Sequence, residues 1–280
     1  MREITATLIT QAVAKLCIDA NINAGGDIVA ALEQAAALER EETPRYILDA
    51  LLENAKIAKE DGLPICQDTG MAVVFIELGQ DVHITGGALT DAVNEGVRQG
   101  YKDGFLRNSV VRDPVRRDNT EDNTPAVIHA FIVPGEYLKL AVAPKGFGSE
   151  NMSALKMLKP SDGLEGLHSF VLETVKKAGG NPCPPVIVGV GAGGTFELAA
   201  ILAKKALLRN AGTKNPDPFW DDAEQRLLAA VNTLNIGPGG FGGQTTALAV
   251  HINPAATHIA GFPVAVNIGC HVTRHKEITL

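Results

Sequence analysis

The spacing of apolar residues changes at Gly70, and this change limits the folds open to the chain. Before Gly70, apolar residues recur every three or four positions, which is the period of helices that bury one face. After Gly70, short apolar runs of strand length alternate with helical segments. The expected fold class is therefore α/β (mixed α+β), with a helical N-terminal lobe at 1–62 followed by a mixed-sheet α/β lobe at 63–280. In the first lobe, helices are expected at 4–20, 27–39 and 44–59.

The second lobe is expected to combine several strands with four helices. The segments 126–133 and 137–144 flank "PGE", which indicates a β-hairpin. Residues 108–125 are polar and interrupted by prolines, so they are expected to form a long loop, and long ordered loops are often functional. The other strands are expected at 71–78, 184–190, 245–252 and 263–268, and the helices at 87–101, 163–178, 196–208 and 221–234.

The net charge of −7 argues against a general binder of nucleic acids or membrane surfaces. No apolar run approaches the length that crosses a bilayer, and the first residues lack the features of a signal peptide. The expectation is a soluble cytoplasmic protein whose cysteines are reduced.

Four cysteines, with no CxxC pair among them, exclude a zinc ribbon or a thioredoxin-type motif. Cys17 falls among apolar residues of an expected helix and is interpreted as a small buried hydrophobic residue. Cys66, Cys183 and Cys270 lie instead in loops or at a strand end. Three thiolates with this spacing suit an iron–sulfur cluster that leaves one iron without a protein ligand, open to a substrate oxygen. The alternative is three unrelated loop cysteines.

A glycine motif, "VGVGAGG", places Gly189, Gly191 and Gly194 between an expected strand and helix. Out of context this spacing suggests a dinucleotide-binding turn. Too little chain follows for a complete dinucleotide-binding half, and residues 209–220 form a loop where a second strand would be needed. Tight packing of the strand against the helix is the favoured interpretation.

Five segments together resemble the class I fumarases, the iron–sulfur hydro-lyase family that includes tartrate dehydratases. They are "LPICQDTG", "RDNTEDNTP", "PKGFGSENMSALKML", "VGVGAGGTFELAA" and "THIAGFPVAVNIGCH", spread over essentially the whole chain. The resemblance implies a [4Fe-4S] cluster on Cys66, Cys183 and Cys270, with one iron not ligated by protein. The chain stops ten residues after Cys270, so it resembles the α subunit of the two-subunit form, whose β subunit carries the rest of the active site.

The resemblance also implies roles for individual residues. It implies that Gln67 contacts the substrate and that Asp68 helps to activate a base from the β subunit, although a turn-capping acid is an open alternative for Asp68. It further implies that His258 lies near substrate oxygens, that Arg107 binds a substrate carboxylate, and that Gly148 offers a backbone amide. The remaining histidines are expected to be structural, including His271, which should point away from the neighbouring cysteine if the strand continues.

The expected function is therefore the catalytic α subunit of a hydro-lyase that reversibly hydrates fumarate to L-malate. It would require a separate β subunit and act on a small dicarboxylate, with no nucleic acid or membrane partner. Dehydration of tartrate is the nearest alternative, because side chains that cannot be placed from the sequence could recognise the extra hydroxyl. A noncatalytic iron–sulfur or redox-sensing protein is the alternative from another functional class.

Overall fold

The computed structural model describes residues 2–280, which form two compact units, each built from segments that are distant in the sequence. Unit 1 comprises Met1–Ala24, Ile57–Phe147 and Arg274–Leu280, and unit 2 comprises Gly25–Lys56 and Gly148–Thr273. This division does not follow the expected boundary at residue 62. The first helix belongs to unit 1, whereas the second helix and most of the third belong to unit 2.

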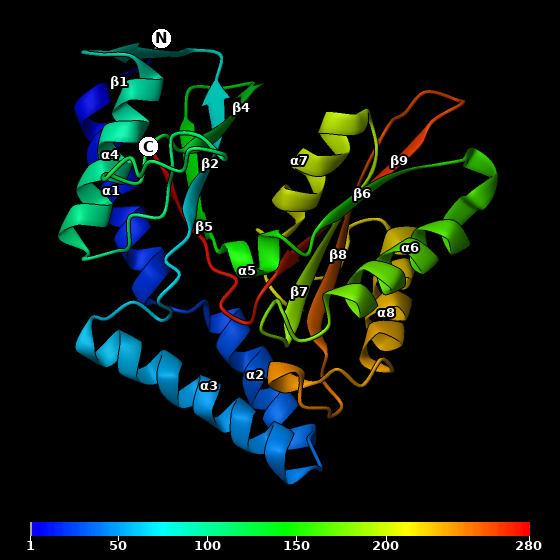
Figure 1. The fold of residues 1–280 in the computed structure, drawn as a ribbon. Helices are drawn as coiled ribbons and strands as arrows, with labels where there is room; N and C mark the ends of the chain where they lie inside the picture. The colour runs from blue at the N-terminus through cyan, green and yellow to red at the C-terminus, as the bar shows by residue number, and fades with distance from the viewer. Residues whose placement is uncertain (1) are drawn as a thin grey trace. The chain divides into compact units, whose positions relative to one another are not determined.

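Unit 1 contains a four-stranded sheet in the order β10-β5-β2-β4, with helices α1 and α4 packed on it (Figure 1). β2 pairs in parallel with β4 and antiparallel with β5, and β10 pairs antiparallel with β5. A separate parallel pair joins β1 and β3. The bounds are β1 Arg2–Thr5, α1 Ala6–Ile22, β2 Met71–Gly79, β3 Val82–Thr85, α4 Leu89–Asp103, β4 Val127–Val133, β5 Leu138–Lys145 and β10 Lys276–Thr279.

The expected hairpin of β4 and β5 is wrong, because β2 lies between them. The loop that joins β4 to β5 crosses over the end of β2, where Gly79 N donates to Tyr137 O (2.9 Å) and Gln80 N donates to Val133 O (2.9 Å). A side chain at position 79 would overlap the carbonyl oxygen of Gly135, so the crossing requires glycine there. β2 is almost entirely apolar and buried, which suits a central strand better than an edge strand.

Helices α1 and α4 pack closely in unit 1 because α4 presents glycines to α1. A Cβ on Gly100 would lie 2.7 Å from Ala14 O and 2.9 Å from the Cβ of Cys17. Cys17 is fully buried, and burial raises the pKa of its thiol to about 12. The interpretation of Cys17 as a buried core residue is confirmed. α1 begins later than expected, since Thr5 caps it by accepting a hydrogen bond from Leu8 N (3.2 Å).

Unit 2 contains a four-stranded sheet in the order β6-β9-β7-β8 (Figure 1). β7 pairs in parallel with β8 and antiparallel with β9, which confirms a mixed α/β fold. Helix α7 covers one face of the sheet, and α6 and α8 cover the other. The bounds are α2 Gly26–Leu38, α3 Glu42–Asp61, α5 Phe147–Glu150, β6 Ala154–Leu158, α6 Gly163–Ala178, β7 Val186–Gly193, α7 Phe196–Ala206, α8 Pro218–Asn232, β8 Ala247–Ala255 and β9 Phe262–Gly269, with short 3-10 helices at Pro160–Asp162 and Pro238–Gly240.

The glycines of "VGVGAGG" allow α7 to lie directly on β7. A side chain at Gly189 would overlap Ala203 O, and one at Gly191 would overlap Ala199 O. Both glycines therefore serve the contact between strand and helix, as the favoured interpretation of this motif requires.

Residues 108–125 contain no helix or strand, as expected. The only β-type backbone pairing among them is an isolated antiparallel bridge between Val111 and Asn119. Hydrogen bonds from Thr124 and Arg98 outweigh partial burial and lower the pKa of Asp122 to about 2. Asp122 therefore pairs with α4 through Arg98 and not with an arginine of its own loop.

Candidate functional site

The loop Cys66–Gly70, between α3 and β2 in unit 1, is held by side chains from three distant parts of the chain. The carbonyl oxygens of its last three residues accept hydrogen bonds, in order, from Arg274 Nη2 (2.6 Å), Tyr101 Oη (2.8 Å) and Asn123 Nδ2 (3.2 Å). All three donor side chains are buried. We call them the carbonyl clamp. Because buried hydrogen bonds of this kind are costly to leave unmade, the clamp fixes the path of the loop.

The carboxylate of Asp68 is oriented by two backbone amides of unit 1. Oδ1 accepts from Gly70 N (3.0 Å) and Oδ2 accepts from Phe147 N (2.9 Å). Asp68 is therefore a turn-capping acid, as the alternative interpretation held. Each carboxylate oxygen keeps a further lone pair, so capping leaves the group able to orient a proton-bearing ligand. The neighbouring Cys66 is half-buried and Gln67 is exposed.

Arg107 is tied to the same loop through its backbone. Its N–H donates to Thr69 Oγ1 (2.9 Å), and Thr69 is almost completely buried. The side chain of Arg107 is exposed. The structure thus ties the backbone of Arg107 to the loop that carries Cys66 and Gln67.

In unit 2, His271 joins the segments that carry Cys183 and Cys270. Its backbone N–H donates to Cys183 O (3.3 Å), and its ring Nδ1 donates to the same oxygen (2.9 Å). The condition for His271 to point away from Cys270 is not met, because β9 ends at Gly269 and the alternation of a strand no longer applies. Cys183 is exposed and Cys270 is half-buried.

Backbone contacts hold the Cys183 segment against a glycine-rich loop at residues 236–243. Gly239 N donates to Pro184 O (2.8 Å). A Cβ on Gly240 would lie 2.8 Å from Gly180 Cα, and Gly240 has φ +82°, so the close approach depends on glycine. Cys183 itself has φ +54°, in the left-handed region.

His258 lies on an exposed turn between β8 and β9. Its Nδ1 accepts a hydrogen bond from Ala260 N (3.2 Å), so the neutral ring carries its proton on Nε2. Thr257 Oγ1 ties the turn to Gly194 O (2.9 Å) at the end of β7. Gly148, on the short helix α5, is exposed. Both residues belong to unit 2.

The donor chemistry of the three loop cysteines fits an iron–sulfur cluster. Cys66, Cys183 and Cys270 form no disulfide and lie at exposed or half-buried positions, whereas Cys17 is sealed in the core. Cys66 belongs to unit 1 and the other two ligand candidates to unit 2. Among residues 2–280, no three histidine, cysteine or carboxylate side chains meet in a group that could hold a metal ion.

Three residues that hold these segments escaped prediction from the sequence. His271 was expected to be structural, but its contact with Cys183 O was not expected. The carbonyl clamp of Tyr101, Asn123 and Arg274 carries no local signal, because each donor acts across more than thirty residues.

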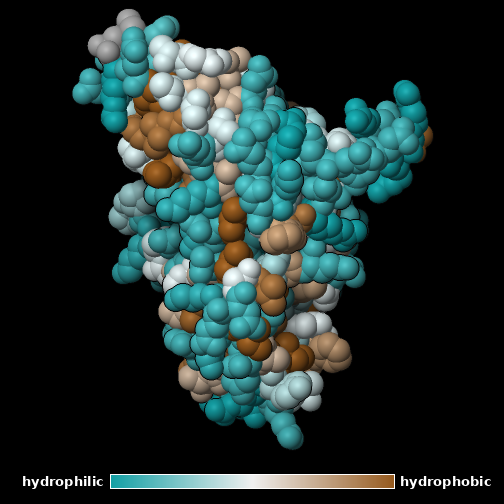
Figure 2. Space-filling model, turned by 90° about the vertical axis from the view of Figure 1, so that its left-hand side faces the viewer, coloured by the Kyte–Doolittle hydropathy of each residue, from teal (hydrophilic) through white to brown (hydrophobic). Residues whose placement is uncertain are grey.

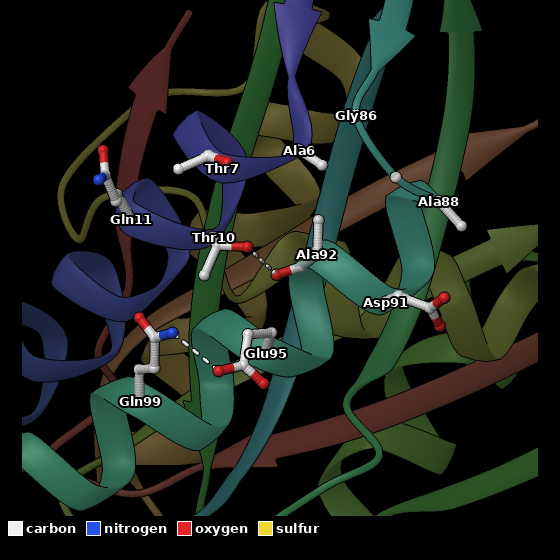
Figure 3. A pocket seen from close by; sticks show the side chains of 11 residues that line it. Ala6, Thr7, Thr10, Gln11, Gly86, Ala88, Asp91, Ala92, Glu95 and Gln99 are labelled. Carbon is white, nitrogen blue, oxygen red and sulfur yellow. Dashed lines mark hydrogen bonds between the residues drawn. The ribbon is translucent and has the colours of Figure 1, made fainter.

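A separate open pocket of about 450 Å³ lies where the N-terminal parts of α1 and α4 meet in unit 1 (Figure 3). Thr10 Oγ1 donates to Ala92 O (3.0 Å) and Gln99 Nε2 donates to Glu95 Oε1 (2.8 Å) in its wall (Figure 3). None of the expected site residues lines it.

The molecular surface seen in Figure 2 is mostly hydrophilic, with hydrophobic residues in small separate groups. Within residues 2–280, no helix combines the length and the apolar content that crossing a membrane requires.

Comparisons with known proteins agree over nearly the whole chain. The family model described as fumarate hydratase (Fumerase) matches residues 10–279. A putative L(+)-tartrate dehydratase subunit alpha of Methanocaldococcus jannaschii is 42% identical, covering 97% of this chain and 98% of that protein. The L(+)-tartrate dehydratase subunit alpha of Escherichia coli K12 is 34% identical, covering 91% and 84%. The chain therefore belongs to the fumarate hydratase (Fumerase) family.

Proposed function

We propose that this chain is the catalytic α subunit of an iron–sulfur hydro-lyase that interconverts a four-carbon hydroxydicarboxylate and its dehydrated product. The observation that carries the proposal is the loop Cys66–Gly70. It presents a thiol, an amide and a carboxylate in succession, on a backbone whose carbonyls are clamped by buried side chains. Such a loop is held in one geometry by the chain's own side chains, and catalysis by orientation requires such support.

Cys66, Cys183 and Cys270 would hold a [4Fe-4S] cluster with one iron not ligated by protein. When bound, such a cluster supplies Lewis acidity toward a substrate oxygen. The hydrogen bonds from His271 to Cys183 O keep the segments of two of these ligands together in unit 2.

The chain's own polar groups would bind the substrate and handle protons. Arg107 offers an exposed guanidinium, which matches a carboxylate in shape and charge. Gln67 and the amide of Gly148 offer neutral donors. The oriented carboxylate of Asp68 can position or accept a proton, since its two amide contacts fix its direction. His258 would donate from Nε2 to a substrate oxygen.

A β subunit would complete the site. The relatives from M. jannaschii and E. coli are named as alpha subunits, which supports a partner chain for this protein as well. The partner would supply the proton-abstracting base and the groups for the far carboxylate of the substrate. A missing base alone commonly lowers a rate by about 10²–10⁴-fold.

Two substrates are proposed. The description of the family supports fumarate and L-malate, and the names of the two relatives support L(+)-tartrate. The test is anaerobic co-expression with the β chain, followed by assays of dehydration of L-malate and of L(+)-tartrate. The proposal is supported if L-malate or L(+)-tartrate is dehydrated and this turnover requires both the β chain and an intact cluster. A cluster-bearing complex that is inactive on both substrates would favour a noncatalytic iron–sulfur protein. Full turnover by the α chain alone would refute the proposal that a β subunit completes the active site.

A further inference from the structure

Arg274 is a buried cation with an unfilled hydrogen-bond donor. The residue is 6% exposed, and its Nη2 donates to the carbonyl oxygen of Asp68 (2.6 Å). Its Nε is buried and has no hydrogen-bond partner among residues 2–280. Buried guanidinium groups are normally paired with an anion, because an unpaired buried charge is costly.

The described neighbours of Arg274 do not supply that anion by direct contact. Tyr101, the adjacent member of the carbonyl clamp, is buried, and so is Cys17, which lies within electrostatic range of Tyr101. Burial raises the pKa of each side chain, so both stay neutral. The carboxylate of Asp68 lies within electrostatic range of the same tyrosine. This carboxylate accepts hydrogen bonds from the amides of Gly70 and Phe147, while Arg274 contacts the backbone carbonyl of Asp68.

We propose that Arg274 is a cationic positioning residue for the ligand Cys66. It holds the Cys66–Gly70 loop by its carbonyl group and places a fixed positive charge beside the anionic group that Cys66 ligates. This inference rests on the proposed function, since the anion is the thiolate-ligated cluster. Charge and hydrogen bonds around a cluster set its potential, and partners outside the ligand shell tune how strongly it is held.

Two substitutions separate the charge of Arg274 from its hydrogen bond. Arg274→Lys and Arg274→Gln can each donate to the Asp68 carbonyl, but only lysine keeps the charge. In the complex with the β chain, Arg274→Gln should release iron to a chelator about 10- to 100-fold faster than the wild type and lower the midpoint potential of the cluster. Arg274→Lys should stay near the wild type in both measurements.

Tyr101→Phe and Arg226→Gln are the controls. Tyr101→Phe removes a neutral member of the carbonyl clamp, so it should speed amide exchange in residues 66–70 and leave the potential unchanged. Arg226 lies on the surface, where it pairs with Asp222, and Arg226→Gln should change neither quantity.

Equal iron release and equal potential for Arg274→Lys and Arg274→Gln would overturn the charge role and leave only a structural one. Amide exchange of residues 66–70 in the metal-free chain tests the positioning role independently. Arg274→Ala removes the hydrogen bond to the Asp68 carbonyl and should speed this exchange, and an unchanged rate in Arg274→Ala would overturn the positioning role. A wild-type complex that binds no cluster would refute the proposed function and the charge role together, while the exchange experiment would still decide positioning.

Discussion

The loop that carries Cys66 and the segments that carry Cys183 and Cys270 are held by different kinds of contact. In unit 1, buried side chains reach the loop from distant positions and grip its carbonyl groups. In unit 2, the support is mainly backbone against backbone, with glycines that allow close approach and one histidine that bridges the two segments. The first loop should therefore be sensitive to side-chain substitution, and the second to any added Cβ.

The largest expected effect is a loss of bound iron that is the same for cysteine variants in both regions. Cys66→Ser, Cys183→Ser and Cys270→Ser should each lose most of the bound iron in anaerobically prepared complex, because each removes a ligand of the proposed cluster. Cys17→Ala is the control and should keep its iron, since Cys17 lies in the core. Iron and sulfide analysis of the four variants measures this. An iron loss in Cys17→Ala equal to the others would favour a four-cysteine cluster.

The second prediction concerns how the free energy of unfolding depends on pH through a buried histidine of unit 2. His251, on β8 of unit 2, is buried, and burial together with nearby Arg209 lowers its pKa to about 4. An unfolded histidine titrates near 6.5, so between about pH 6.5 and 4 the unfolded chain binds the extra proton. The free energy of unfolding should therefore fall as pH drops through this window, by up to about 3 kcal/mol.

Denaturant unfolding from pH 7 to 4 measures this loss. His251→Asn should flatten the dependence, because asparagine can replace the donor to Ala206 O without titrating. His83→Asn, at an exposed position of unit 1, should leave the dependence as it is. An unchanged slope in His251→Asn would show that another group causes the loss.

The third prediction concerns the backbone contacts of unit 2. Gly240→Ala should lower the free energy of unfolding by about 1–3 kcal/mol, because Gly240 has a positive φ and its Cβ would press on Gly180. Gly26→Ala is a matched control at the start of α2, where a Cβ meets nothing within 4 Å. Thermal unfolding of both variants measures the difference. If Gly240→Ala left the free energy of unfolding unchanged, the loop at residues 236–243 would have to shift and make room for the added Cβ at little cost.

The smallest effect belongs to the long loop of unit 1. The depressed pKa of Asp122 stabilises the fold above the pKa of an unfolded aspartate, near 3.9, and the contribution is lost as pH falls through about 2. Asp122→Asn should cost less than about 1 kcal/mol at neutral pH, since the pair with Arg98 is partly exposed. Urea unfolding at pH 7 and pH 2.5 measures this, and a cost that is the same at both would point to lost packing.

Local patterns in the sequence predict most of the helices. The periodicity places α6 at its observed bounds and α2 within one residue at each end. The order of the strands cannot be read locally, because β4 and β5 are adjacent in the chain yet both pair with β2. The short strands β6 and β10 were not predicted, since four or five residues give too little alternation to recognise.

The candidate site divides in the same way. The succession Cys66, Gln67, Asp68 is visible in the sequence because the residues are neighbours. The hydrogen bond from Arg274 to the carbonyl of Asp68 joins residues that are 206 positions apart. No periodicity or local motif in the sequence predicts such a contact.

That separation has a consequence for the order of events during synthesis. A ribosome completes both segments of unit 2 before it reaches Arg274, whereas unit 1 still lacks the guanidinium of its cysteine loop and the edge strand β10. The loop around Cys66 is made early and can take its final geometry only after Arg274 has been made. Contacts between such remote positions also slow folding, because a long stretch of chain must be closed before they form. Iron that arrived before Arg274 was made would therefore meet an unfinished loop, and assembly of the proposed cluster should follow synthesis of Arg274.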